Sequence, residues 1–123
     1  MNLAVNGLGR MGRLFLRAAL QRGLRVVAAN EPKGDPASLA LGLEFDSVHG
    51  RYPLPVRGEP GALQVGEHRL ALLQTTEAAT LPWQKLGVDL LVECSGKIKK
   101  AELLAAHHAA GARCVVVSNP VPG

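Results

Sequence analysis

The sequence predicts an α/β domain built on an open, mostly parallel β-sheet, and three observations support this. A short apolar run, Asn2–Asn6, ends at glycines, the 3.6-residue period of an amphipathic helix begins directly after it, and a second apolar run follows at Leu24–Ala29. A strand, a helix and a strand within about 30 residues form a unit whose strands are parallel neighbours, because only a long crossover can connect parallel strands.

The first helix is expected to have an apolar face and a basic face. The residues expected to face the core are Met11, Leu14, Phe15, Ala18 and Ala19, and those expected to face solvent are Arg10, Arg13, Arg17 and Gln21. Gly23 is the expected end of this helix, because glycine adopts the left-handed conformation that follows many helices.

A second helix and a hairpin are predicted in the middle of the chain. Asp35 and Pro36 mark a helix start, since proline suits the first helical position, and the helix is expected to run to Phe45. The segment after it is rich in glycine and proline and less regular. Within it, two alternating stretches, Ala62–Val65 and His68–Leu73, flank a glycine turn and predict a small antiparallel hairpin.

Regular elements are predicted again in the last third of the chain. The expected elements are a buried strand at Val88–Cys94, a helix at residues 99–110 closed by Gly111, and a strand at Cys114–Val117. No internal repeat, low-complexity tract or linker divides the sequence. Residues 1–123 are therefore expected to form one domain.

Composition and charge narrow the class of protein. The chain is 47% hydrophobic and 20% charged, which is typical of a globular domain, and no apolar run approaches the roughly 18 residues of a membrane span. The N-terminus lacks the pattern of an export signal, so we expect a cytoplasmic protein.

Cys94 and Cys114 lie in apolar runs and are expected to be buried, reduced thiols, with neither a disulfide nor a metal site. The net charge of +4 is scattered among acids, which favours small phosphates over nucleic acid.

Gly7, Gly9 and Gly12 follow the spacing Gly-x-Gly-x-x-Gly between a predicted strand and a predicted helix. Gly7 permits a tight turn, Gly9 lets a pyrophosphate approach the backbone, and Gly12 lets the helix pack closely on the strand. The helix start adds unpaired N–H groups and partial positive charge, and Arg10 adds a formal charge. The alternative is a glycine turn with no ligand. In this context the motif predicts a doubly wound, Rossmann-type fold that binds a dinucleotide.

Glu31 stands at the end of the second predicted strand, about 20 residues after the glycines. A carboxylate there accepts hydrogen bonds from the adenosine ribose and repels a 2′-phosphate, which favours NAD over NADP. Lys33 softens that repulsion, so NADP binding stays possible. The alternative for Glu31 is a solvated charge at a strand end.

Four segments in order along the chain resemble the N-terminal, NAD(P)-binding part of the glyceraldehyde-3-phosphate dehydrogenase family. They are Val5–Arg13, Phe45–Tyr52, Leu81–Trp83 and Leu86–Lys97. Three further stretches are similar to a subgroup associated with arsenate resistance, in which arsenate replaces phosphate: Asn30–Asp35, Leu43–Asp46 and Glu93–Lys97.

The resemblance implies a set of cofactor contacts. They are Asn6, Gly7, Gly9, Arg10 and Met11 on the pyrophosphate side, Asn30 and Glu31 at the adenosine ribose, Thr76 at the adenine, Ser95 and Gly96 beside the dinucleotide, and Ser118 near the nicotinamide. The family usually has Asp at the position of Glu31 and Thr at that of Ser95, and both exchanges keep the chemistry. Thr76 stands where an arginine often flanks the adenine, which puts the strength of that contact in doubt.

The family's reaction also needs residues that we do not find here. It oxidises an aldehyde with a cysteine thiolate and a histidine, transfers a hydride to NAD, and lets phosphate or arsenate capture the thioester. The resemblance places that cysteine and histidine beyond the end of this sequence, so the domain is expected to be truncated before the catalytic domain and inactive alone. The family assembles as homotetramers.

Other candidate residues are expected to have no catalytic role. Asp46 and His49 are expected to stabilise a loop, and His107 and His108 to be solvated on a helix. A different class of function stays open, a non-catalytic nucleotide-binding or interaction module that acts with a partner chain. Nucleic-acid binding through the basic faces is a third hypothesis, and it predicts steep salt dependence.

Overall fold

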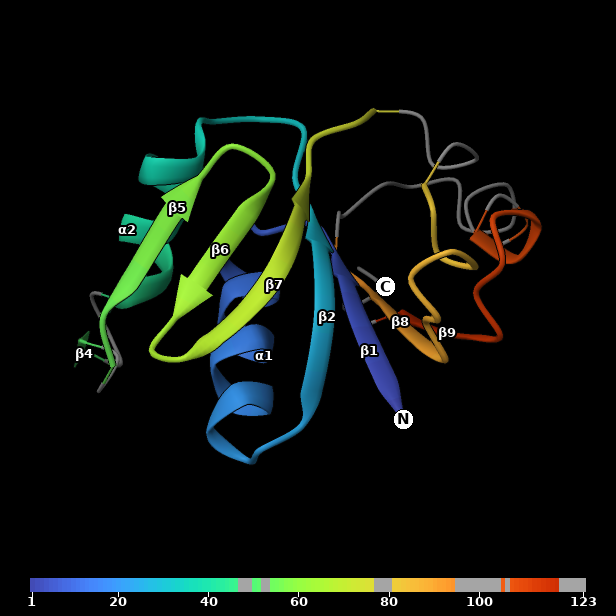
Figure 1. Ribbon diagram of the computed structural model, residues 1–123, viewed down its shortest axis with the longest axis horizontal. Helices are drawn as coiled ribbons and strands as arrows, with labels where there is room; N and C mark the ends of the chain where they lie inside the picture. Colours follow the sequence, from blue (N-terminus) through green and yellow to red (C-terminus); the bar gives the residue numbers. More distant parts are fainter. Residues whose placement is uncertain (47–49, 52–53, 77–80, 95–104, 106, 118–123) are drawn as a thin grey trace, which may run out of the picture.

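The computed structural model describes residues 1–46, 50–51, 54–76, 81–94, 105 and 107–117 (Figure 1). Its elements are β1 (Asn2–Asn6), α1 (Arg10–Gln21), β2 (Arg25–Asn30), α2 (Pro36–Glu44), β3 (Phe45–Asp46), β4 (Gly50–Arg51), β5 (Val56–Glu59), β6 (Ala62–Val65), β7 (His68–Leu73), β8 (Leu90–Glu93) and β9 (Cys114–Val117). Of the predicted helix at 99–110, residues 105 and 107–109 are helical, and the others except residue 110 lie outside the described part. Within that part, no helix combines the length and the apolar character needed to cross a bilayer.

The main sheet has seven strands in the order β5-β6-β7-β2-β1-β8-β9. β1 lies in the parallel part and pairs with β2 on one side and β8 on the other, while β7 and β9 extend this part in parallel. β5 and β6 add antiparallel strands beyond β7. The predicted mostly parallel sheet and its hairpin are confirmed, and β5 is a strand that the sequence analysis did not predict.

The order of the strands creates a switch point at β1. After β1 the chain adds β2 beside it, continues at the far edge with β5, and comes back through β6 to β7 next to β2. It then adds β8 and β9 on the other side of β1. At such a point the connections leave the sheet in opposite directions, and a crevice forms outside the carboxyl ends of the two neighbouring strands.

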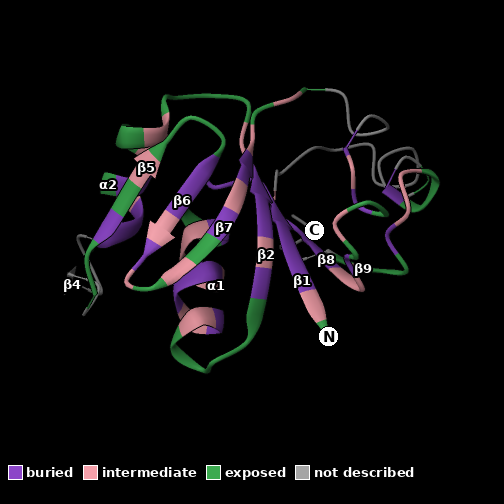
Figure 2. Cartoon of the chain, in the orientation of Figure 1, coloured by how far each residue is buried: buried purple, intermediate pink, exposed green. Residues whose placement is uncertain are grey.

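α1 and α2 cover one face of the sheet, and a cluster around Trp83 covers the other face at β1, β2 and β8. α1 and α2 lie on the same face in Figure 1 and contact the sheet and each other. Because side chains alternate along a strand, Leu3 and Val5 pack into the core cluster under these helices, and Ala4 between them packs into a second cluster around Trp83. Buried residues therefore run almost the whole length of β1 (Figure 2).

The predicted core face of α1 is partly wrong. The buried residues are Gly12, Leu16, Arg17 and Ala19, whereas Met11 is 48% exposed. Gly12 explains the rotation, because a Cβ at this position would lie 1.8 Å from the carbonyl oxygen of Gly7. The side of α1 that carries Gly12 must therefore face the turn, which brings Leu16 and Ala19 onto the sheet and Arg17 out of solvent.

Cys94 and Cys114 also differ from expectation. Cys94 is half-buried and Cys114 is exposed, although both were predicted to be buried. Cys114 begins β9, the outermost strand of the described sheet, which pairs there with β8 on one side. The apolar pattern of a strand predicts its burial only if other elements cover it, and an edge strand is covered less than a central one.

Two carboxylates fix the ends of elements through backbone N–H groups. Asp35 caps α2, where the N–H of Ser38 donates to Oδ1 at 2.7 Å, and this bond holds the pKa of Asp35 below its usual value. Asp89 accepts from the N–H of Asn2 at 2.9 Å, which is the main reason why its pKa is also lowered. The predicted start of the second helix is thus confirmed, and the bond between Asn2 and Asp89 joins the start of β1 to the segment before β8.

A substitution at Gly58 tests how closely β5 approaches α2. Gly58→Ala is expected to lower the free energy of unfolding by about 2 kcal/mol or more, because its Cβ would lie 1.8 Å from the carbonyl oxygen of Pro36. Gly42→Ala is the control: its Cβ would meet only the flexible side chain of Arg13 at 3.4 Å, so a stabilisation of about 0.5–1 kcal/mol is expected within α2. Urea unfolding measures both, and a neutral Gly58→Ala would contradict the described packing.

Candidate functional site

A cavity of about 220 Å³ opens at the carboxyl ends of β1, β2 and β8, where the strand order predicts a crevice. The residues that line it are Asn6, Gly7, Gly9, Glu31, Pro32, Lys33 and Cys94. Four of them, Asn6, Gly7, Gly9 and Glu31, are predicted site residues that the fold brings together from two separate segments. Cys94 was predicted as a strand residue only, and its place on the cavity wall follows from the pairing of β8 with β1.

The glycine turn has the geometry that its spacing predicts. Gly7 has a φ of 102°, a conformation that side chains rarely adopt, and its N–H donates to the carbonyl oxygen of Asn30 at 2.7 Å. Gly12 packs against Gly7 with no room for a Cβ, whereas a Cβ on Gly9 would meet no described atom within 4 Å. Gly9 therefore leaves open space in front of the backbone at the start of α1.

No side chain in the described part of the chain caps the N-terminus of α1. Every residue of α1 is described, and the helix has no acidic side chain in its first turn and no side-chain cap on Gly9. Its first N–H groups have no partner within the helix, and they carry partial positive charge. Arg10 and Met11, two further predicted site residues, lie exposed at this end. The cavity thus borders a positive helix end that lacks its own counter-charge.

Glu31 is another residue that lines the cavity, and its carboxylate is bonded to the glycine turn. Its Oε1 accepts from the N–H of Leu8 at 2.7 Å, and its Oε2 accepts from the N–H of Lys33 at 3.2 Å. The segment after β2 is held in turn by Gln74, whose Nε2 donates to the carbonyl oxygens of Glu31 and Gly34. Glu31 therefore links the glycine turn to this segment while it keeps a negative charge beside the cavity.

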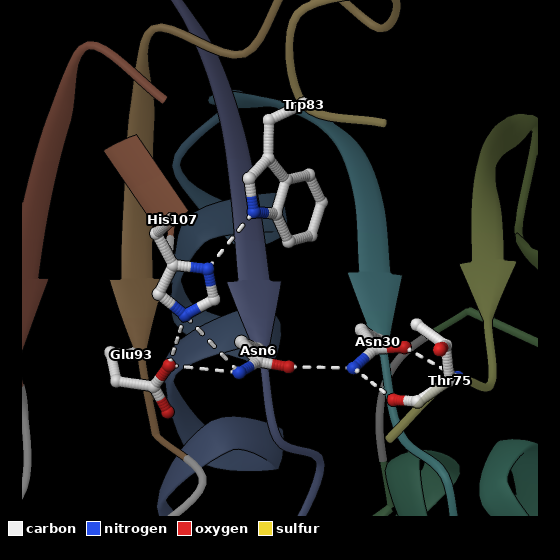
Figure 3. A network of polar contacts seen from close by, with 6 residues as sticks. All are labelled: Asn6, Asn30, Thr75, Trp83, Glu93 and His107. Atoms are coloured by element: carbon white, nitrogen blue, oxygen red, sulfur yellow. Dashed lines mark hydrogen bonds and ion pairs between the residues drawn. The ribbon is translucent and has the colours of Figure 1, made fainter. Parts of the chain in front are cut away.

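A line of buried amides joins neighbouring strand ends (Figure 3). Asn30 Nδ2 donates to Asn6 Oδ1 at 2.7 Å and to the carbonyl oxygen of Thr75 at 3.1 Å, and the N–H of Thr75 donates back to Asn30 Oδ1. Asn6 Nδ2 donates to Glu93 Oε2 at 2.8 Å. The line fixes the carboxyl ends of β2, β1 and β8 against one another, and the side-chain amide of Asn6 is held inside the protein.

His107 continues this line, and its predicted solvation is wrong. Its side chain is fully buried, with Nε2 2.6 Å from Glu93 Oε2, while Trp83 Nε1 donates to Nδ1 at 3.1 Å. The imidazole can be buried because each ring nitrogen has a polar partner. One sequence signal could have indicated it: Glu93 ends an apolar strand run, and a buried carboxylate requires a donor. His108, by contrast, is exposed.

Two of the remaining predicted site residues, Thr76 and Asn30, do not line the cavity. Thr76 is exposed on the bend after β7, and Asn30 is buried in the amide line. Ser95, Gly96 and Ser118 lie outside the described residues, as do His49 and the side chain of Asp46. The predicted roles of these residues stay predictions.

Comparison with known proteins gives a consistent set of matches. The family model described as "Glyceraldehyde 3-phosphate dehydrogenase, NAD binding domain" matches residues 1–101. Glyceraldehyde-3-phosphate dehydrogenase of Oncorhynchus mykiss is 41% identical over 120 residues, which cover 98% of this chain and 36% of that protein. The testis-specific enzyme of Mus musculus is 38% identical over 122 residues, 99% of this chain and 28% of its own. Glyceraldehyde-3-phosphate dehydrogenase 2 of Staphylococcus aureus is 38% identical over 123 residues, 99% of this chain and 36% of its own. The chain thus spans about a third of the length of these relatives.

Asn30→Asp tests the amide line. The change puts an acceptor in place of the donor that faces Asn6 and Thr75, so the free energy of unfolding at neutral pH is expected to fall by about 2–4 kcal/mol. The buried carboxyl has a raised pKa in the folded state, so the loss should shrink as the pH falls below about 5 and the oxygen gains a proton that it can donate.

Gln74→Glu is the matched control for this change. Gln74 Nε2 also donates to two carbonyl oxygens, but these contacts are exposed and water can replace them, so a loss below about 1 kcal/mol is expected. Urea unfolding at several pH values measures both variants. Equal losses in the two would contradict the importance of the buried line.

Proposed function

Because the chain belongs to the glyceraldehyde-3-phosphate dehydrogenase family as its NAD-binding domain, we propose that the cavity between β1, β2 and β8 is where NAD binds. The observation that carries the proposal is the pairing of two opposite charges at one cavity. The N-terminus of α1, with no side-chain cap at Gly9, and the carboxylate of Glu31 both border this cavity. A dinucleotide has an anionic pyrophosphate for the first and ribose hydroxyls for the second.

The residues of the glycine turn receive the pyrophosphate in this proposal. The open space at Gly9 admits it, and the backbone N–H groups of Arg10 and Met11 and the charge of Arg10 balance its two negative charges. Gly7 sets the direction of the turn by its positive φ. Asn6 contributes indirectly, because its side-chain amide is hydrogen-bonded to Glu93 and Asn30.

Glu31 receives the adenosine ribose. Its oxygens already accept two backbone N–H groups and keep further lone pairs for ribose hydroxyls. A 2′-phosphate would bring negative charge against this carboxylate, which favours NAD over NADP. Asn30 lies beside it, and Thr76, Ser95, Gly96 and Ser118 are proposed from the family resemblance alone to border the adenine, the dinucleotide and the nicotinamide.

The activity of a whole protein built on this domain follows from the family. We propose that it oxidises glyceraldehyde 3-phosphate with hydride transfer to NAD and passes the acyl group to phosphate or arsenate, in a cytoplasmic homotetramer. The cysteine and histidine of that reaction are proposed to lie outside the sequence described here. The contribution of this chain is then to bind the cofactor and to orient it.

Gly9→Ala separates binding from folding. The variant should keep its free energy of unfolding within about 1 kcal/mol, because Gly9 has a φ of −71° and its Cβ would meet no described atom. Its Kd for NAD should rise about tenfold or more, because the methyl group occupies the path of the pyrophosphate. Titration calorimetry measures the Kd, with Gly42→Ala as the control for a glycine exchange away from the cavity. Unchanged NAD binding by Gly9→Ala would contradict the proposed orientation.

Glu31→Gln tests the ribose contact. Losing a charged acceptor should raise the Kd for NAD by about tenfold or more and reduce the preference for NAD over NADP. Glu67→Gln, the same exchange at the exposed turn between β6 and β7, should change neither value. If the folded wild-type chain binds neither dinucleotide, the result would instead favour a module that needs a partner chain.

A further inference from the structure

We propose that His107 is a positioning residue for dinucleotide binding, a neutral imidazole that holds the Asn6 amide in one orientation through Glu93. The inference rests on the proposed function of the cavity. His107 lies on a helix remote in sequence from the glycine turn, and its side chain is fully buried. It therefore acts through other residues.

Trp83 determines where the imidazole carries its proton. An indole Nε1–H is only a donor, so His107 Nδ1, 3.1 Å away, must offer its lone pair. The proton of the neutral ring is then on Nε2, which faces Glu93 Oε2 at 2.6 Å. A second proton on Nδ1 would point two N–H groups at each other. Trp83 thus selects one tautomer of His107.

Glu93 passes this orientation on to Asn6. The same oxygen, Oε2, accepts from His107 Nε2 and from Asn6 Nδ2, which is 2.8 Å away. Because an ionised carboxylate cannot donate, the nitrogen of the Asn6 amide must face Glu93, and Oδ1 must face Asn30 Nδ2. A flipped amide would place oxygen against oxygen on one side and nitrogen against nitrogen on the other. Asn6 Nδ2 and His107 Nε2 lie 3.4 Å apart, and in this arrangement both are donors to Glu93 and do not bond to each other.

Asn6 and Glu93 control two walls of the cavity. Asn6 lines it and directly precedes Gly7, whose positive φ starts the glycine turn. Glu93 directly precedes Cys94, which also lines the cavity and whose N–H donates to the carbonyl oxygen of Asn6 at 2.7 Å. A displacement of Glu93 therefore moves both the end of β1 and the end of β8.

The charge around His107 fits this role. Among the described residues, the polar atoms that contact its ring come from Trp83, Glu93 and Asn6, and Glu93 is the charged one. Without His107, Oε2 of the buried Glu93 carboxylate loses the His107 Nε2 donor, and the Trp83 N–H loses its acceptor. The side chains of the line then rearrange, which disturbs Asn6, because Asn6 Nδ2 donates to the same Oε2.

Two variants test the proposal in the full chain, with NAD as the probe. His107→Leu removes both polar atoms, whereas His107→Gln keeps an N–H donor for Glu93 and an oxygen acceptor for Trp83. His107→Leu should raise the Kd for NAD on the order of tenfold, the loss typical when an orienting partner is removed, and His107→Gln should stay within about threefold of wild type. Urea unfolding reports stability separately, so that Kd values are compared for folded protein.

The proposal is overturned if both variants bind NAD as wild type does, or if both are weakened equally. If His107→Leu does not fold, Trp83→Phe replaces it: this variant keeps an aromatic ring, removes the N–H that selects the tautomer, and should also weaken NAD binding while His107→Gln does not.

Nitrogen NMR of the ligand-free chain tests the tautomer of His107 on which the proposal rests. It should show an unprotonated Nδ1 and a protonated Nε2 for His107. The opposite tautomer or an imidazolium would overturn the proposal. The NMR measurement does not depend on NAD and decides the tautomer of His107 by itself. A wild-type chain that fails to bind NAD would contradict the proposed function, and this is a separate result.

Discussion

The hydrogen-bonded line from Thr75 through Asn30 and Asn6 to Glu93 is the constraint on which the site depends (Figure 3). Parallel strands are fixed laterally by their backbone ladders, but their carboxyl ends, where the ladders stop, are held by side chains. Here buried amides and one carboxylate satisfy one another across β2, β1 and β8, and leaving any of these groups unpaired would be costly. The glycine turn and the segment after β2 begin directly at these fixed ends.

At these fixed strand ends, the positive N-terminus of α1 and the negative carboxylate of Glu31 border the same cavity. α1 starts beside Gly9 with no acidic residue in its first turn, and Glu31 faces the same space from the end of β2. Because the N–H of Leu8 donates to Glu31, the positive and negative sides are joined by a direct bond before any ligand is present. In the proposed binding mode, this bond fixes the two sides of the cavity relative to each other, which reduces the ordering that binding must impose.

Local patterns were sufficient to predict much of this. The strand, glycine turn and helix at the N-terminus, the cap at Asp35 and the hairpin of β6 and β7 each depend on residues close in sequence. The face of α1 was predicted wrongly because several rotations fit its period, and the contact of Gly12 with Gly7 selects one of them. The burial of His107 depends on Glu93 and Trp83 from two other segments, a long-range arrangement that periodicity does not encode. β5 was missed because it lies in a segment rich in glycine and proline.

The most direct test of the account is a crystal structure of the chain grown with NAD. The account predicts the pyrophosphate against the backbone N–H groups at the start of α1 beside Gly9, ribose hydroxyls within hydrogen-bond distance of Glu31, and the contacts between Asn6, Glu93 and His107 unchanged. NAD bound at another part of the surface, or bound in the cavity with the amide line broken, would contradict it.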